Sequence, residues 1–119
     1  TVLFTVTGAV WARVWGHVTT AVTSTGDTGT IAVGIAGNAS KLVASYTAGS
    51  GTIVAHDILA GAGTTAVPGD NLGLTSQFIY IGGGEDINAT VATNNLTGGV
   101  IDWYCEWYPV NATGRVVSA

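Results

Sequence analysis

Two acidic residues near the end of the chain, Asp102 and Glu106, are the first candidates for chemistry. They belong to segment 98–109, GGVIDWYCEWYP, in which apolar and polar or aromatic side chains alternate. Successive side chains of an extended strand point to opposite faces, so this alternation predicts a strand with both carboxyl groups on one face. The two residues are four positions apart, which along a strand corresponds to roughly 13 Å. The two carboxyl groups of a glycosidase lie only about 5–9.5 Å apart, so this pair does not favour acid–base catalysis.

The two histidines, His17 and His56, do not predict a metal site or a catalytic triad. A zinc site needs three or four ligands with one or two of them close in sequence, and His56–Asp57 is the nearest approach to such a pair. The nucleophilic serine of many hydrolases lies in a Gly-x-Ser-x-Gly turn between a strand and a helix. Ser50 lies instead in AGSGT, which has the composition of a loop. We therefore expect no enzyme activity, no metal and no cofactor.

Charge is scarce throughout the chain. Charged residues make up 8% of the 119 residues, against about 25% in a typical soluble domain. Mean hydropathy is +0.45. Because no run of about 18 apolar residues exists, we expect no membrane partner and favour assembly, in which apolar faces are covered by other subunits. The net charge is −4, and the three cationic residues are scattered, so nucleic acid is not an expected partner either.

The remaining pattern is that of a single all-β domain over residues 1–119. Strand-like segments alternate with turn-like clusters every eight to twelve residues or so, which predicts an antiparallel β-sandwich or barrel of about eight strands. A long loop is expected over 59–73. The predicted strands are 2–7 and 9–22 (or one long bent strand), 31–35, 41–46 (or a single helical turn), 52–58, 74–81, 87–91 and 98–109.

Two of these predicted strands carry aromatic residues on the face opposite to the one expected to pack in the core. In 9–22 the Val and Ala face looks like core, and Trp and Arg, which are enriched at interface hot spots, occupy the other face. Burial of that second face between sheets, with Arg13 extending past the rings, is the alternative. In 98–109 the core face is expected to hold Ile101, Trp103, Cys105 and Trp107, with Cys105 as a buried free thiol. The expected interface residues are Trp11, Arg13, Trp15, His17, Asp102, Tyr104, Glu106 and Tyr108.

Three groups of segments resemble small virion proteins of tailed bacteriophages. They are 3–8 running into 14–20, then 32–38, and finally 87–90 continuing through 96–99 to 103–109. The resemblance implies a capsid decoration (cement) protein that lies on the outer surface of the virion head. It also implies a β-rich subunit that binds the major capsid protein and its own copies, as a homotrimer or another homo-oligomer.

Two other functions remain open on the sequence. The first is a tail or fibre module that binds a host receptor or glycan. In that module Trp11, Trp15, Tyr104 and Tyr108 would act as stacking platforms. The second is a hydrolase domain without a recognisable motif.

Overall fold

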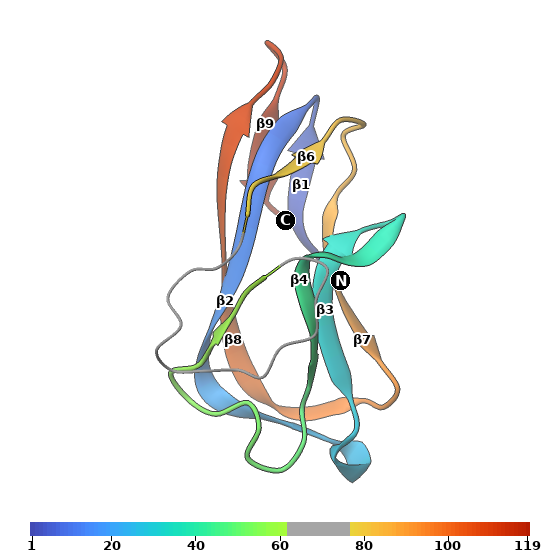
Figure 1. Ribbon diagram of the computed structural model, residues 1–119, viewed down its shortest axis with the longest axis vertical. Helices are drawn as coiled ribbons and strands as arrows, with labels where there is room; N and C mark the ends of the chain where they lie inside the picture. The colour runs from blue at the N-terminus through green and yellow to red at the C-terminus, as the bar shows by residue number, and fades with distance from the viewer. Residues whose placement is uncertain (62–76) are drawn as a thin grey trace.

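Two antiparallel β-sheets enclose one core in the computed structural model, which describes residues 1–61 and 77–119 (Figure 1). The larger sheet has the strand order β4-β3-β7-β1-β9. In the smaller sheet β2 is central: β5 and β6 pair with different parts of one edge of β2, and β8 pairs with the other edge. The strands are β1 Val2–Thr7, β2 Val10–Ser24, β3 Thr30–Ile35, β4 Asn38–Thr47, β5 Ile58–Leu59, β6 Ile79–Ile81, β7 Ile87–Ala92, β8 Leu96–Pro109 and β9 Arg115–Ser118, with a 3-10 turn at Thr25–Asp27.

The chain passes from the larger sheet to the smaller one at Gly8, between β1 and β2. Gly8 has a φ of +65°, a conformation that glycine adopts without a steric penalty. A Cβ atom here would also lie 2.6 Å from Oγ1 of Thr113 and 2.8 Å from Oδ1 of Asn111. This break confirms the prediction of two strands and rules out the single bent strand.

The core follows the alternation in β2. Val10, Ala12, Val14 and Val18 are fully buried, and the alternate residues Trp11, Arg13, Trp15 and His17 lie on the outer face. Buried residues of the larger sheet, such as Val33, complete the core. The predicted all-β antiparallel sandwich is therefore confirmed, with nine strands in the described part of the chain.

Segment 52–58 is not the strand that the sequence predicts. Only Ile58 and Leu59 form a regular strand pairing with β2. Ile53, His56 and Asp57 make single backbone hydrogen bonds to β2, and turns interrupt the segment. The side chains of this segment bond to nearby backbone: the Asp57 carboxylate accepts the Val54 amide at 3.0 Å, and the Thr52 hydroxyl donates to the Thr47 carbonyl at 2.8 Å. Such local bonds compete with strand pairing.

Other boundaries differ in smaller ways. Residues 41–46 belong to the longer strand β4, which excludes the helical turn. The aromatic strand begins at Leu96, and β9 was not predicted at all. The expected strand 74–81 is described only from residue 77 onward and includes β6, whereas most of the expected loop over 59–73 falls outside the described residues.

Candidate interaction surface

The pairing of β2 with β8 brings the two predicted sets of interface residues together. The strands run side by side for most of their length (Figure 1). Directly opposed residues of an antiparallel pair have Cβ atoms about 4.5–5.5 Å apart, so each pair forms a contact on the outer face. The four pairs are Trp11 with Tyr108, Arg13 with Glu106, Trp15 with Tyr104, and His17 with Asp102.

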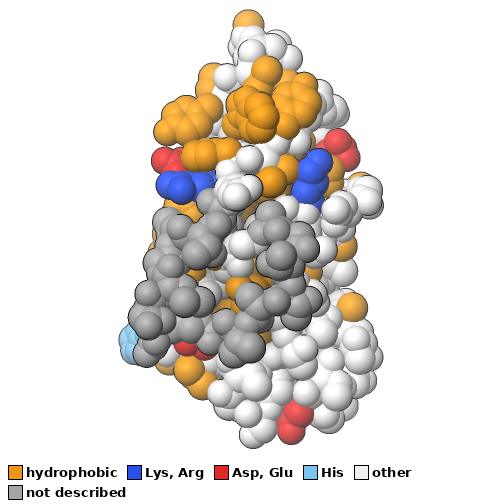
Figure 2. Space-filling model, viewed as in Figure 1, with side chains coloured by type: hydrophobic (Ala, Val, Ile, Leu, Met, Phe, Trp, Pro, Cys, Tyr) orange, Lys and Arg blue, Asp and Glu red, His pale blue; other side chains and the backbone are white. Residues whose placement is uncertain are grey.

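One end of this face is an aromatic cluster that includes β6. Trp11 pairs with Tyr80 of β6 on one side and with Tyr108 of β8 on the other, and the Trp11 and Tyr80 ring centroids are 5.4 Å apart. The ring centroids of Phe78 and Tyr108 lie 5.3 Å apart. The exposed fractions are 46% for Trp11, 47% for Tyr80 and 55% for Tyr108, so these rings are open to solvent. Figure 2 shows hydrophobic side chains gathered at the upper end of the molecule, where β6 lies beside β2 in Figure 1.

Phe78 and Tyr80 were missing from the predicted interface. Their alternation with Ile79 and Ile81 does indicate that they share a strand face. Which strand lies beside them is not a local property, because β6 pairs with residues about 70 positions earlier in the chain. The alternation was therefore enough to place Phe78 and Tyr80 on one face but not to place that face beside Trp11.

Arg13 is the only cation in the middle of this surface among the described residues. Its Nε atom donates to Oε1 of Glu106 at 2.6 Å, and Nη2 forms a salt bridge with the same oxygen. The guanidinium carbon lies 4.9 Å from the Phe78 ring centroid and 5.8 Å from that of Trp15. Both ionic side chains are about a third exposed, so screening by water limits this pair to about 1 kcal/mol or less. Its main effect is to hold the guanidinium against the aromatic rings.

The other end of the face contains a stacked pair and two histidines. The ring centroids of Trp15 and Tyr104 lie 5.8 Å apart with an interplanar angle of 15°, so the two rings are nearly parallel and stack with an offset. The rings of His17 and His56 are 6.3 Å apart. Across residues 1–61 and 77–119, no three His, Cys, Asp or Glu side chains gather closely enough to hold a metal ion.

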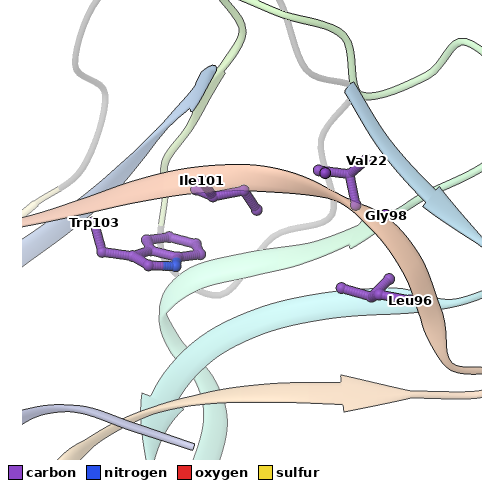
Figure 3. A pocket seen from close by; sticks show the side chains of 6 residues that line it. Val22, Leu96, Gly98, Ile101 and Trp103 are labelled. Carbon is purple, nitrogen blue, oxygen red and sulfur yellow. The ribbon is translucent and has the colours of Figure 1, made fainter. Parts of the chain in front are cut away.

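The inner face of β8 is less buried than predicted. Ile101, Trp103, Cys105 and Trp107 do pack against the core, but each stays partly accessible to solvent. The reason is that β8 is the outermost strand of its sheet, with a neighbour on one side only in the described part of the chain. A pocket opens beside its first half (Figure 3), lined by Val22, Leu96, Gly98, Gly99, Ile101 and Trp103.

The Cys105 thiol is predicted to react slowly in the folded protein. Burial, with a smaller contribution from the Glu106 carboxylate, raises the pKa of this thiol from 9.0 to about 11. At pH 8 the thiolate fraction is then lower in the folded chain than in the unfolded chain by about 100-fold, and only the thiolate is nucleophilic. We expect iodoacetamide to alkylate the native protein at least about tenfold more slowly than the protein in denaturant.

The same shift has a consequence for stability. Because the pKa is higher in the folded state, the stabilisation associated with the neutral thiol is fully present below pH 9 and is lost as the pH rises toward 11. A Cys105→Ala variant should not show this alkaline loss. Equal alkylation rates for native and denatured wild-type protein would contradict the proposed burial of the thiol.

All eight predicted interface residues thus lie on one outer face, and the structure adds Phe78 and Tyr80 to them. We call these ten residues the aromatic face. No helix among the described residues is long and apolar enough to cross a membrane. Comparisons with protein-family models, with curated proteins and with solved structures found no match to this chain.

Proposed function

We propose that this chain is a structural protein of a bacteriophage virion, of the capsid decoration type, and that it docks on the head shell through the aromatic face. The observation that carries the proposal is the exposure of Trp11, Tyr80, Tyr104 and Tyr108, each 46–55% exposed on one sheet face. Clustered exposed apolar side chains mark interaction sites, and Trp, Tyr and Arg are enriched among the residues that dominate binding energy. The resemblance to small phage virion proteins indicates that the assembly is a virion head.

In this proposal the partners are the major capsid protein and copies of the chain itself. A decoration protein binds many equivalent sites on a shell, so a modest contact at each site becomes strong stabilisation when one oligomer bridges several subunits. Because the decoration protein binds the assembled shell, its binding also stabilises the shell by mass action. The aromatic face suits such a contact because its rings can supply apolar area for burial. The Arg13–Glu106 pair places polar groups among those rings.

A second candidate is a tail or fibre module that binds a host glycan, and the solvent-open rings of Trp11 and Tyr108 favour it. Stacking on a sugar chain requires ring faces that are both free and similarly oriented. The Trp11 and Tyr80 rings are inclined by 56°, and those of Phe78 and Tyr108 by 53°. The rings of Trp15 and Tyr104 are nearly parallel and stack on each other with an offset. The tilted rings of the Trp11 cluster support a protein partner over a flat polysaccharide platform.

Binding to shells is the direct test. Purified protein is added to head shells of the parent phage that lack it, and bound copies are counted by quantitative mass spectrometry after sedimentation. We expect saturation at a copy number comparable with the number of capsid subunits, and higher resistance of the shells to heat and low salt. A copy number far below the subunit number, together with binding to host cell-surface polysaccharide, would contradict the decoration role and support the tail module.

A further inference from the structure

We propose that the free edge of β8 pairs with β8 of a second copy, in an antiparallel arrangement around a two-fold axis at Trp103. This contact differs from the aromatic face: it uses the backbone edge of the strand and the pocket beside it. It does not depend on the proposed role in the virion.

The backbone groups of the odd-numbered residues of β8 point to its free edge. The Val110 amide donates to the Ala9 carbonyl at 2.9 Å, so the amide at position 110 points toward β2. The amide and carbonyl of Val18 bond instead to Asp57 and His56, on the side away from β8. Val18 is opposite Ile101, so these two residues form a non-hydrogen-bonded pair. Because the direction alternates along a strand, the edge groups belong to Ile101, Trp103, Cys105 and Trp107.

From Ile101 onward, β8 has few of the features that discourage another strand from pairing there; its only charged residues are Asp102 and Glu106. Natural edge strands are protected by lysine, by proline, by bulges or by short length. β8 is 14 residues long, contains no lysine or arginine, and has its only proline at the last position. The irregularities in its pairing with β2 all fall before Ile101, so the half that carries the edge groups is regular. Within residues 1–61 and 77–119, β2 is the only strand that pairs with β8.

The acidic residues exclude two of the possible registers. Pairing about Tyr104 would place Asp102 opposite Glu106 of the second copy, and pairing about Asp102 would place two Asp102 residues opposite each other. Like charges directly opposed across strands are destabilising. Pairing about Trp103 places Asp102 opposite Tyr104 and leaves no acid opposite another acid. Pairing about Cys105 also leaves no acid opposite another acid, and in both registers the paired residues have backbone groups that point to the edge. The pocket separates the two, because only pairing about Trp103 brings residues of the second strand opposite Gly98 and Gly99.

The pocket beside β8 receives a side chain in this register. If the pairing continues past Ile101 into the irregular stretch, where Gly99 has a φ of +115°, position 99 lies opposite Trp107 of the second copy and position 98 lies opposite Tyr108. Gly98 and Gly99 line the pocket and have no side chains to occupy it, and Ile101 and Trp103 form its apolar wall (Figure 3). Trp107 and Ile101 lie on the same face of β8, so Trp107 of the second copy projects on the side that the pocket wall occupies. Pairing would complete the burial that Trp103 and Trp107 lack in the single chain.

The paired sheets would also place two aromatic faces side by side on one surface. A two-fold axis perpendicular to the sheet keeps both outer faces on the same side, so the dimer presents two copies of the Trp11 cluster in one direction. Two linked sites bind more tightly to a repeating lattice than one site does. The proposal therefore replaces the homotrimer implied by the resemblance with a two-fold pair.

A matched pair of substitutions tests the edge. Cys105→Pro removes an edge amide and the thiol, and Cys105→Ala removes the thiol alone. We expect the wild type and Cys105→Ala to sediment with twice the mass of the 11.9 kDa chain, and Cys105→Pro to dissociate at least tenfold more readily. Circular dichroism and thermal melting establish that each variant is folded. A wild-type protein that is monomeric at all concentrations, or that forms trimers, would overturn the proposal.

Cysteine cross-linking tests the register without a proline. In a Cys105→Ala background, Asp102→Cys with Tyr104→Cys places two exposed thiols opposite each other across the axis. Diagonal neighbours lie about 7–8 Å apart, beyond the range of a disulfide. Mild oxidation should therefore give a covalent dimer with the 102/104 pair and little with Asp102→Cys and Glu106→Cys. Cross-linking of the second pair alone would overturn the register. Both experiments use purified protein without shells, so a failure to bind shells leaves this result intact.

Discussion

Replacing Trp11 with alanine is expected to weaken docking on the capsid shell by about 30-fold or more while the protein stays folded. Trp11 is the central ring of the aromatic cluster, between Tyr80 on β6 and Tyr108 on β8. Truncation of a central Trp at an interface typically costs 2 kcal/mol or more, which corresponds to about 30-fold in the dissociation constant. Trp11 is 46% exposed and lies on the outer face, so its removal leaves no cavity in the core. The measurement is a sedimentation binding isotherm with shells.

Val117→Ala is the matched control for this prediction. Val117 is 45% exposed, close to the value for Trp11, and it lies in β9 beside the buried Val116, on the outer side of the larger sheet. Its truncation should change shell binding by less than about twofold, because residues outside a hot spot contribute little. Equal losses for both variants would show that the aromatic face is not the docking surface. Unchanged binding for Trp11→Ala would show the same.

Replacing Gly34 with alanine is expected to destabilise the fold by about 3 kcal/mol or more. Gly34 lies in β3 between β4 and β7, where a Cβ atom would collide with the carbonyl oxygen of Asn38 and with the carbonyl group of Ala39. These are backbone atoms of the hairpin that β3 itself forms, so no side-chain rotation can relieve the overlap. Overpacking in a tight site costs about 1–3 kcal/mol and occasionally more. Against a total stability of about 5–15 kcal/mol, this loss is large.

Gly37→Ala provides the comparison three residues away. A Cβ atom at Gly37 would meet nothing within 4 Å. We expect its free energy of unfolding to match or slightly exceed that of the wild type, because alanine restricts the unfolded chain more than glycine does. Urea unfolding followed by tryptophan fluorescence gives both values. Coinciding transitions for the two variants would contradict the close packing of β3 against the β4 backbone.

The faces of the two long strands could be predicted from the sequence. In β2 the buried residues are Val10, Ala12, Val14 and Val18, as the alternation predicted, and in β8 the odd positions face the core. This success has a simple physical basis: side-chain direction alternates along any extended strand, so it needs only local information. The strand prediction for 52–58 was wrong for a local reason too. The Asp57 and Thr52 side chains bond to backbone groups of Val54 and Thr47, and such local bonds compete with strand pairing.

The neighbours of each residue were decided only by the tertiary structure. The pairing of Arg13 with Glu106 joins residues 93 positions apart, and the sequence predicted both as interface residues without placing them together. Phe78 and Tyr80 joined the aromatic face for the same kind of reason. The partial exposure of Trp103 and Trp107 depends on β8 being an outer strand, which the alternation within β8 cannot indicate. Side-chain direction is a property of one strand, whereas register and edge position are properties of the whole sheet.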